Sequence, residues 1–218
     1  MAKQTRTKRV VRRWRGRENR AKFLERITPI FAPSTVHEIM LAYYLAKQAH
    51  RWQVRKEKDP EGRPLRYFEH LRRVALIILD ECRIADPSLV ILGILHDGWE
   101  DTWELNLHMI EHCFGTDIAM MVARCSKKPK RGFLQRLRDY GTWPILVVKL
   151  ADRLDNLRSL SSTSIAFQLK QLRETERKYF ALADKLTRTI PHEHQHAAAF
   201  LRNEIYQEVK QRREALAA

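Results

Sequence analysis

The 218-residue chain is long enough for one domain with a substantial core, because 44% of its residues are hydrophobic and only seven are glycine. Its longest apolar run is far shorter than the roughly 20 residues that cross a bilayer, and the N-terminus lacks the apolar stretch of a signal peptide. We therefore expect a cytoplasmic protein without a membrane span. The three cysteines are widely spaced and odd in number, which is typical of reduced, buried thiols.

The net charge of +15 is concentrated at the N-terminus, where residues 1–26 hold 11 Lys and Arg against two Glu. We predict that residues 1–26 form a basic, flexible arm and that residues 27–218 form a single domain. Such an arm attracts RNA or another polyanion through counterion release, and Trp14 offers a stacking surface. A solvated tail has the same composition, and an anionic membrane surface would serve equally well as a partner, so these alternatives stay open.

After the arm, the sequence predicts helices joined by short polar breaks, and hence an all-α domain. A helix begins at Pro33 and Ser34, followed by apolar residues at helical spacing. The segment "QVRKEKDPEGRPLRYF" is predicted to contain a loop, because Pro60, Gly62 and Pro64 interrupt it and its middle part, from Arg55 to Arg63, is highly charged.

Further helices follow in chain order. One resumes around residues 69–83, and the next starts at Asp86-Pro87-Ser88 and continues through the segment "LVILGILHDGWED". Two short helices broken near Gly115, a helix over 144–160 and a long polar helix over about 164–187 come next. An amphipathic helix closes the chain.

The stretch "SLVILGILHDGWEDTWEL" follows an apolar run with His96, Asp97, Glu100 and Asp101, all within six positions. On a continuous helix, His96 and Glu100 are four residues apart, as are Asp97 and Asp101, so their side chains can share one side. Taken alone, this cluster is equally typical of the solvated end of a buried helix.

A second apolar run, in "PILVVKLADRLDNLRSL", leads to Asp152, with Asn156 one turn later on the same face. His70 precedes a third apolar segment. Each has an ordinary structural reading, such as an aspartate paired with Arg153. Together, however, two imidazoles and two carboxylates form a mixed ligand set suited to Mn²⁺, Fe²⁺ or Zn²⁺.

The segments "HRWQVRK", "YFEHLRRVA", "ILHDGWEDT", "FGTDIAMMV" and "VVKLADRLDNLRSL" occur in the order and approximate spacing of the HD superfamily. They closely resemble the hydrolase domain of RelA/SpoT-type alarmone enzymes. The resemblance covers about His37 to Tyr179 and implies an HD-domain helical bundle. About thirty residues follow Leu186, too few for a synthetase domain, so the resemblance implies a stand-alone hydrolase that does not synthesise alarmones.

The resemblance also implies roles for individual residues. The metal ligands, usually of Mn²⁺, are His70, His96, Asp97 and Asp152. The acidic pair that orients and deprotonates water is Glu100 and Asp101. Arg55 packs on the guanine base with Lys56 beside it, Asn156 lies at the nucleoside, and Arg153 and Arg158 are supporting charges. The implied reaction is hydrolysis of the 3′-diphosphate of (p)ppGpp to GDP or GTP and pyrophosphate.

Three features depart from the family pattern. The loop between Arg55 and His70 is longer than the family's compact loop, Trp99 stands where a smaller aliphatic residue is usual, and Asp155 stands where histidine or tyrosine is common. Two alternative functions are compatible with part of this motif pattern. One is another HD phosphohydrolase acting on a nucleotide or NADPH. The other is a nucleic-acid-binding protein with a vestigial HD site.

Overall fold

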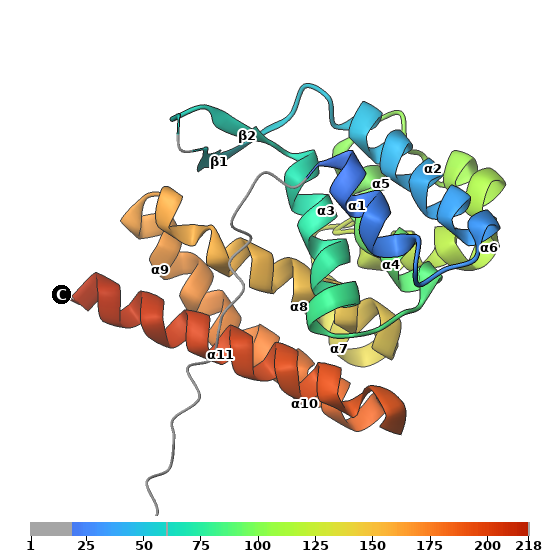
Figure 1. The fold of residues 1–218 in the computed structure, drawn as a ribbon. Coiled ribbons are helices and arrows are strands. Elements are labelled where there is room, and N and C mark those ends of the chain that lie inside the picture. The colour runs from blue at the N-terminus through green and yellow to red at the C-terminus, as the bar shows by residue number, and fades with distance from the viewer. Residues whose placement is uncertain (1–18, 60, 218) are drawn as a thin grey trace, which may run out of the picture.

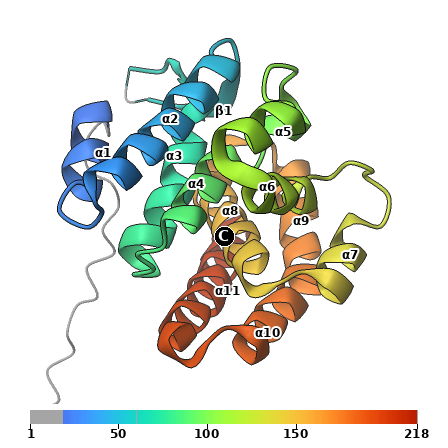
Figure 2. The same cartoon turned by 90° about the vertical axis from the view of Figure 1, so that its right-hand side faces the viewer.

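Helix α8 (Trp143–Arg158) forms the centre of the molecule, and the other helices pack around it (Figures 1 and 2). Every residue from Ile145 to Asp155 is buried, and the helix contacts α3, α4, α6, α10 and α11. Helix α4 (Pro87–Leu95) is likewise buried on all sides from Leu89 to Leu95, as its apolar sequence requires. The two apolar runs that precede the candidate ligands are therefore the inner helices of the bundle.

The computed structural model describes residues 19–59 and 61–217. Besides α4 and α8, the helices are α1 (Arg20–Ile27), α2 (Pro33–Ala49), α3 (Phe68–Leu76), α5 (Gly98–Asp101), α6 (Leu107–Cys125), α7 (Phe133–Tyr140), α9 (Ile165–Glu174), α10 (Phe180–Thr189) and α11 (Gln195–Ala217). Two π-helical turns, Ile77–Glu81 and Thr175–Tyr179, extend α3 and join α9 to α10, and short 3₁₀ turns lie at Leu160–Ser162 and His192–His194. Strands β1 (Val54–Lys58) and β2 (Pro64–Arg66) form an antiparallel hairpin.

The predicted helical fold is confirmed, and several of the residues predicted to start, cap or interrupt helices do so. Pro33 is the first residue of α2. The side chain of Asp86 caps α4 by accepting hydrogen bonds from the backbone N–H groups of Ser88 and Leu89. Gly115 has φ +83°, a conformation that favours glycine, and interrupts the helical geometry of α6. No helix in the described part of the chain is long and apolar enough to cross a membrane.

The predicted loop is wrong at Val54–Lys58 and Pro64–Arg66, which pair as strands β1 and β2 of a hairpin (Figure 1), and only the turn that joins them fits the prediction. This turn is closed by Asp59, whose backbone oxygen accepts from Gly62 N at 2.9 Å and whose side chain accepts from Arg63 N at 2.8 Å. Exposure alternates along β1, with Arg55 and Glu57 less exposed than their neighbours. The alternation involves charged rather than apolar residues, so hydrophobic periodicity could not reveal it.

Two further boundaries differ from the prediction. The helix expected to run through "HDGWED" ends at Leu95, so His96 and Asp97 lie in a turn and only Glu100 and Asp101 are on the short α5. Within the predicted arm, Asn19 caps α1, and Phe23 of that helix is fully buried. The rest of the arm, residues 1–18 with Trp14, lies outside the described residues.

Candidate active site

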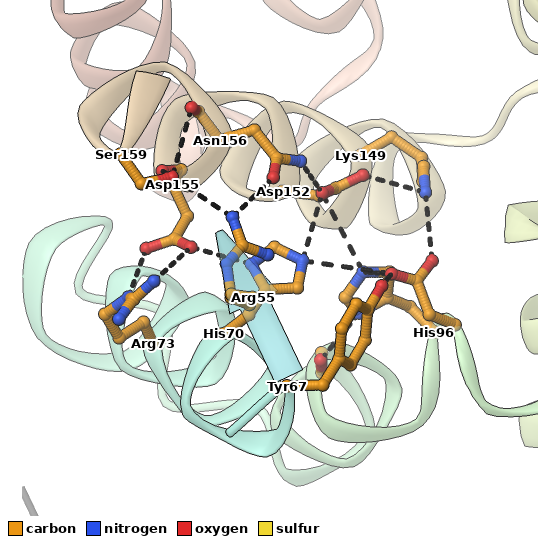
Figure 3. A network of polar contacts seen from close by, with 12 residues as sticks. Arg55, Tyr67, His70, Arg73, His96, Lys149, Asp152, Asp155, Asn156 and Ser159 are labelled. Carbon is orange, nitrogen blue, oxygen red and sulfur yellow. Dashed lines mark hydrogen bonds and ion pairs between the residues drawn. The ribbon is translucent and has the colours of Figure 1, made fainter. Parts of the chain in front are cut away.

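The four predicted metal ligands come together where α3, α8 and the turn after α4 meet. His70, His96 and Asp152 of this group are labelled in Figure 3. Ligand atoms of His70, His96, Asp97 and Asp152 all lie within 4.8 Å of one another, and all four side chains are buried. His70 Nε2 is 3.3 Å from Asp152 Oδ1, and His96 Nε2 is 3.1 Å from Asp97 Oδ2. Residues separated by more than 80 positions in the sequence thus form one cluster.

The hydrogen bonds of the two histidines suit them to bind a metal. His96 Nδ1 lies 2.8 Å from the carbonyl oxygen of Gly93, and His70 Nδ1 lies 2.7 Å from Asp155 Oδ2. Donation from each Nδ1–H leaves the Nε2 lone pair directed at the cluster. His96 Nε2 and Asp97 Oδ1 are buried without a hydrogen-bond partner, as expected of atoms that coordinate a metal when it is bound. The donor set therefore fits a divalent metal.

A lysine with no role predicted from the sequence, Lys149, lies beside the cluster. Lys149 is fully buried, with its Nζ 2.9 Å from Asp152 Oδ2 and 3.8 Å from Asp97 Oδ1. Burial raises the pKa of both carboxyls, but Lys149 and the neighbouring histidines outweigh it, so the pKa values of Asp97 and Asp152 are well below the usual range. Both candidate ligands are therefore carboxylates.

The predicted acidic pair lies at the edge of this cluster and is held by two further residues. Glu100 Oε2 accepts a hydrogen bond from the backbone N–H of Lys127 at 2.8 Å, and Lys127 Nζ is 3.4 Å from Glu100 Oε1. The Tyr67 hydroxyl donates to Asp97 Oδ2 at 2.8 Å and lies 3.1 Å from Asp101 Oδ2. Burial, Asp97 and Glu100 raise the pKa of Asp101 above its ordinary value.

A cavity of about 550 Å³ adjoins the cluster and carries the predicted substrate-binding residues. Arg55, on β1, donates to Asn156 Oδ1 at 2.9 Å and to Ser159 Oγ at 3.1 Å. Asn156 in turn donates to Asp152 Oδ1 at 2.5 Å, so the cavity and the ligand cluster share a hydrogen-bonded border. Lys56 Nζ lies 5.0 Å from the centre of the Phe167 ring on α9, at the cavity wall.

The two supporting arginines of "LADRLDNLR" make different contacts. Arg153 lines the cavity, but it stacks on Tyr179 at 3.8 Å and binds Gln171 and Glu174. Arg158 forms a two-point ion pair with Glu81, which joins α8 to the π-helical turn after α3. These contacts hold the helices together.

Three residues at the site were not predicted from the sequence: Tyr67, Lys127 and Lys149. Lys149 lies three residues before Asp152, a spacing that places both on one helix face, so the signal was present but looked like an ordinary surface pair. Lys127 and Tyr67 reach the site through tertiary packing. The position of Lys127 in the sequence gives no spacing signal, whereas Tyr67 lies three residues before His70, the same separation as Lys149 and Asp152.

Comparisons with known proteins agree with these observations. The chain is 32% identical over 168 residues to a GTP pyrophosphokinase of Streptomyces antibioticus, a match that covers 72% of this chain and 19% of that protein. It is 32% identical over 163 residues to a probable guanosine-3′,5′-bis(diphosphate) 3′-pyrophosphohydrolase of Synechocystis, covering 68% and 20%. It is 34% identical over 119 residues to the Mus musculus guanosine-3′,5′-bis(diphosphate) 3′-pyrophosphohydrolase MESH1, covering 52% and 65%.

The fold is also similar to that of a solved structure, described as a metazoan ortholog of SpoT that hydrolyses ppGpp. The TM-score is 0.60 at 25% identity, and the match covers 80% of this chain and 95% of that one. No protein-family model matches the chain. The chain spans only about a fifth of the length of the first two relatives above.

Proposed function

Because this chain belongs to the RelA/SpoT-type HD hydrolases, we propose that it cleaves the 3′-diphosphate of (p)ppGpp, giving pyrophosphate and GDP or GTP. The observation that carries the proposal is the buried two-histidine, two-aspartate cluster at the border of a 550 Å³ cavity that contains Arg55 and Asn156. A nucleotide held in that cavity would have one end at the cluster.

His70, His96, Asp97 and Asp152 would hold the metal, which we propose to be Mn²⁺. When bound, a divalent ion supplies Lewis-acid activation of water and of a phosphoryl group. The ligand set also suits Fe²⁺ and Zn²⁺. The pyrophosphate-release assay below therefore compares Mn²⁺, Fe²⁺ and Zn²⁺ to identify the metal.

The two acids have different environments and so suit different tasks. Burial, Asp97 and Glu100 raise the pKa of Asp101, which suits its carboxylate to accept the proton of the attacking water. Glu100 is fixed by two contacts from Lys127 and is suited to orient that water. The water oxygen forms a bond to phosphorus as the bond between phosphorus and the 3′-oxygen breaks. The 3′-oxygen takes up a proton and becomes the hydroxyl of the product, and pyrophosphate is released.

The cavity residues position the nucleotide. We assign Arg55 to the guanine base, because its guanidinium faces the cavity and is braced by Asn156 and Ser159. Lys56 and Lys127 also line the cavity and supply positive charge for the phosphates. Asn156 connects the nucleoside end to the ligand cluster through Asp152.

The test is release of pyrophosphate from ppGpp and pppGpp by the purified chain, measured with Mn²⁺, Fe²⁺, Zn²⁺ and excess chelator. We expect metal-dependent turnover that the chelator abolishes. NADPH and a nucleotide panel are assayed in parallel. Turnover of one of these without turnover of ppGpp would replace the alarmone with another phosphohydrolase substrate. No turnover of any would favour a vestigial site.

A further inference from the structure

Asp155 departs from the family pattern and makes two strong contacts in the interior. The side chain is buried on α8, with Oδ2 2.7 Å from His70 Nδ1 (Figure 3). On its other side, Arg73 Nε donates to Oδ1 at 2.6 Å and Arg73 Nη2 donates to Oδ2 at 3.0 Å. One carboxylate therefore bridges a metal-ligand imidazole and a guanidinium.

The two ligand histidines differ in what holds them. His96 donates to a backbone carbonyl, whereas His70 donates to a carboxylate. A carboxylate acceptor fixes the Nδ1–H tautomer and increases the basicity of Nε2 more than a neutral acceptor does. Loss of such a partner in other metal sites typically weakens metal affinity by about 10- to 100-fold.

Arg73 carries the contact further, to the hairpin. The same Nη2 that binds Asp155 also lies 2.8 Å from Glu57 Oε2 on β1. Glu57 Oε2 is in turn 4.0 Å from Nε of Arg55, two residues earlier on the same strand. The ligand His70 and the strand that presents Arg55 are therefore joined through three consecutive ionic contacts.

We propose that Asp155 is a positioning residue that fixes His70 for metal binding, and that Arg73 and Glu57 extend its hold to the β1 strand. The first half concerns metal affinity and stands without any assumption about substrate. The part that concerns nucleotide affinity rests on the proposed function. A purely structural ion pair between Asp155 and Arg73 would stabilise the fold but leave metal affinity unchanged.

The first experiment measures Mn²⁺ affinity by calorimetry in the full-length chain carrying Asp155→Asn. We expect the dissociation constant to rise by about 10- to 100-fold, because the amide supplies no charge to hold the His70 N–H. Asp184→Asn is the matched control, since it removes a half-exposed carboxylate that binds Arg202 on the outer helices. Unchanged affinity in Asp155→Asn, or an equal loss in the control, would overturn the proposal.

A second measurement covers the case in which Asp155→Asn does not fold. In the Zn²⁺-loaded wild-type protein, nitrogen-15 NMR should show a His70 Nδ1–H proton that is protected from exchange with water. That proton reports the tautomer directly. Its absence, or a spectrum with the proton on Nε2, would contradict the assignment of Asp155.

The third measurement tests the connection to the hairpin. Glu57→Gln should speed hydrogen exchange in 54–58 and 64–66 while leaving Mn²⁺ affinity within about twofold, because Glu57 does not contact His70. Glu61→Gln, at the exposed turn of the same hairpin, is the control and should leave exchange in the strands unchanged. Equal exchange in wild type and Glu57→Gln would remove the hairpin from the network.

With ppGpp as substrate, Glu57→Gln should also raise KM several-fold at a similar kcat, the pattern of lost ground-state binding. Unchanged KM in an active enzyme would overturn the nucleotide part of the proposal. An enzyme inactive on ppGpp would refute the proposed function instead, and the Mn²⁺ and exchange results would still decide the role of Asp155.

Discussion

The ligand cluster and the β1–β2 hairpin border the same cavity but are built differently. The cluster side chains are at most 8% exposed and come from the core helices α3 and α8 and from the turn that follows α4. The hairpin places Arg55 and Glu57, 12% and 29% exposed, on a short strand held by ion pairs. Buried helices fix atoms closely enough for chemistry, whereas a strand tied by a few polar contacts is suited to recognition.

This difference predicts two kinds of variant. A change in the cluster should remove metal and turnover together, because the ligands have no substitute nearby. A change in the hairpin should weaken substrate binding and leave the metal in place. The following predictions test this division in order of expected size.

The largest effect is expected from the ligands. His96→Ala or Asp97→Ala should abolish both metal retention and ppGpp hydrolysis, because a site that loses a ligand loses affinity and orientation together. Metal content by elemental analysis and pyrophosphate release are measured on the same preparations. A variant that retains metal stoichiometrically would show that the replaced residue is not a ligand.

The next effect concerns the acids, which lie beside the ligands without belonging to them. Glu100→Gln should leave metal content and substrate affinity near wild type and lower kcat by about two orders of magnitude or more, because the attacking water loses the carboxylate that orients it. Single-turnover kinetics with a parallel binding measurement separates these quantities. Normal kcat with weakened affinity would move Glu100 from the chemistry to substrate binding.

The helical half of the site was largely predictable from the sequence. Apolar runs before His96 and before Asp152 predicted the inner helices, and the structure brings both residues to one cluster with His70. Spacing along a helix correctly placed Asn156 beside Asp152, one turn apart on α8. The convergence of the three segments came from the family resemblance, since no local pattern encodes which helices pack together.

The remainder could not be predicted, for physical reasons that differ between residues. The hairpin was missed because β1 alternates charges rather than apolar residues. The helix through "HDGWED" was predicted to be continuous, but it is interrupted at His96. Lys149 was overlooked because lysine is rarely buried, and only the two carboxylates facing it explain its position. The metal identity and the cytoplasmic location remain predictions.

Lys149 supplies the third prediction, which concerns stability. Lys149→Met leaves Asp97 and Asp152 buried without their cation, so the chelator-treated protein should lose about 3 to 5 kcal/mol of unfolding free energy. Added Mn²⁺ should recover part of this loss, because the ion compensates the same carboxylates. Urea unfolding with chelator and with Mn²⁺ checks this, and Lys210→Met, at an exposed site on α11, is the control. An equal loss in both conditions would contradict it.

Variants of Arg55 test the expectation that changes in the hairpin weaken substrate binding and leave the metal in place. Arg55→Ala should raise KM for ppGpp by about tenfold, equivalent to about 1.4 kcal/mol, with full metal content and a smaller change in kcat. Arg55→Lys should recover little, because an ammonium group reproduces neither the planar stacking surface nor the contacts to Asn156 and Ser159. A loss of metal in either variant would show that the hairpin supports the ligand cluster directly.

The smallest effect on turnover is expected from deleting residues 1–18. These residues carry eight Lys and Arg and one Glu, but none of the proposed site residues. The deletion should end before Asn19, because Asn19 caps α1 and Arg20 donates to the Tyr44 hydroxyl at 2.8 Å. Hydrolysis should then stay within about twofold of wild type, as for independent sites.

A deletion through Ile27 provides the contrast, because it also removes Phe23 and Ile27, which are fully buried, and should destabilise the domain. If residues 1–18 bind RNA through phosphate contacts, the intact chain should bind it with a steep dependence on salt that the shorter deletion largely removes. Filter binding over a salt series, with turnover measured on the same samples, separates the outcomes. Equal and salt-insensitive binding would leave these residues a solubilising tail, whereas loss of hydrolysis in the shorter deletion would mean that they support the catalytic domain.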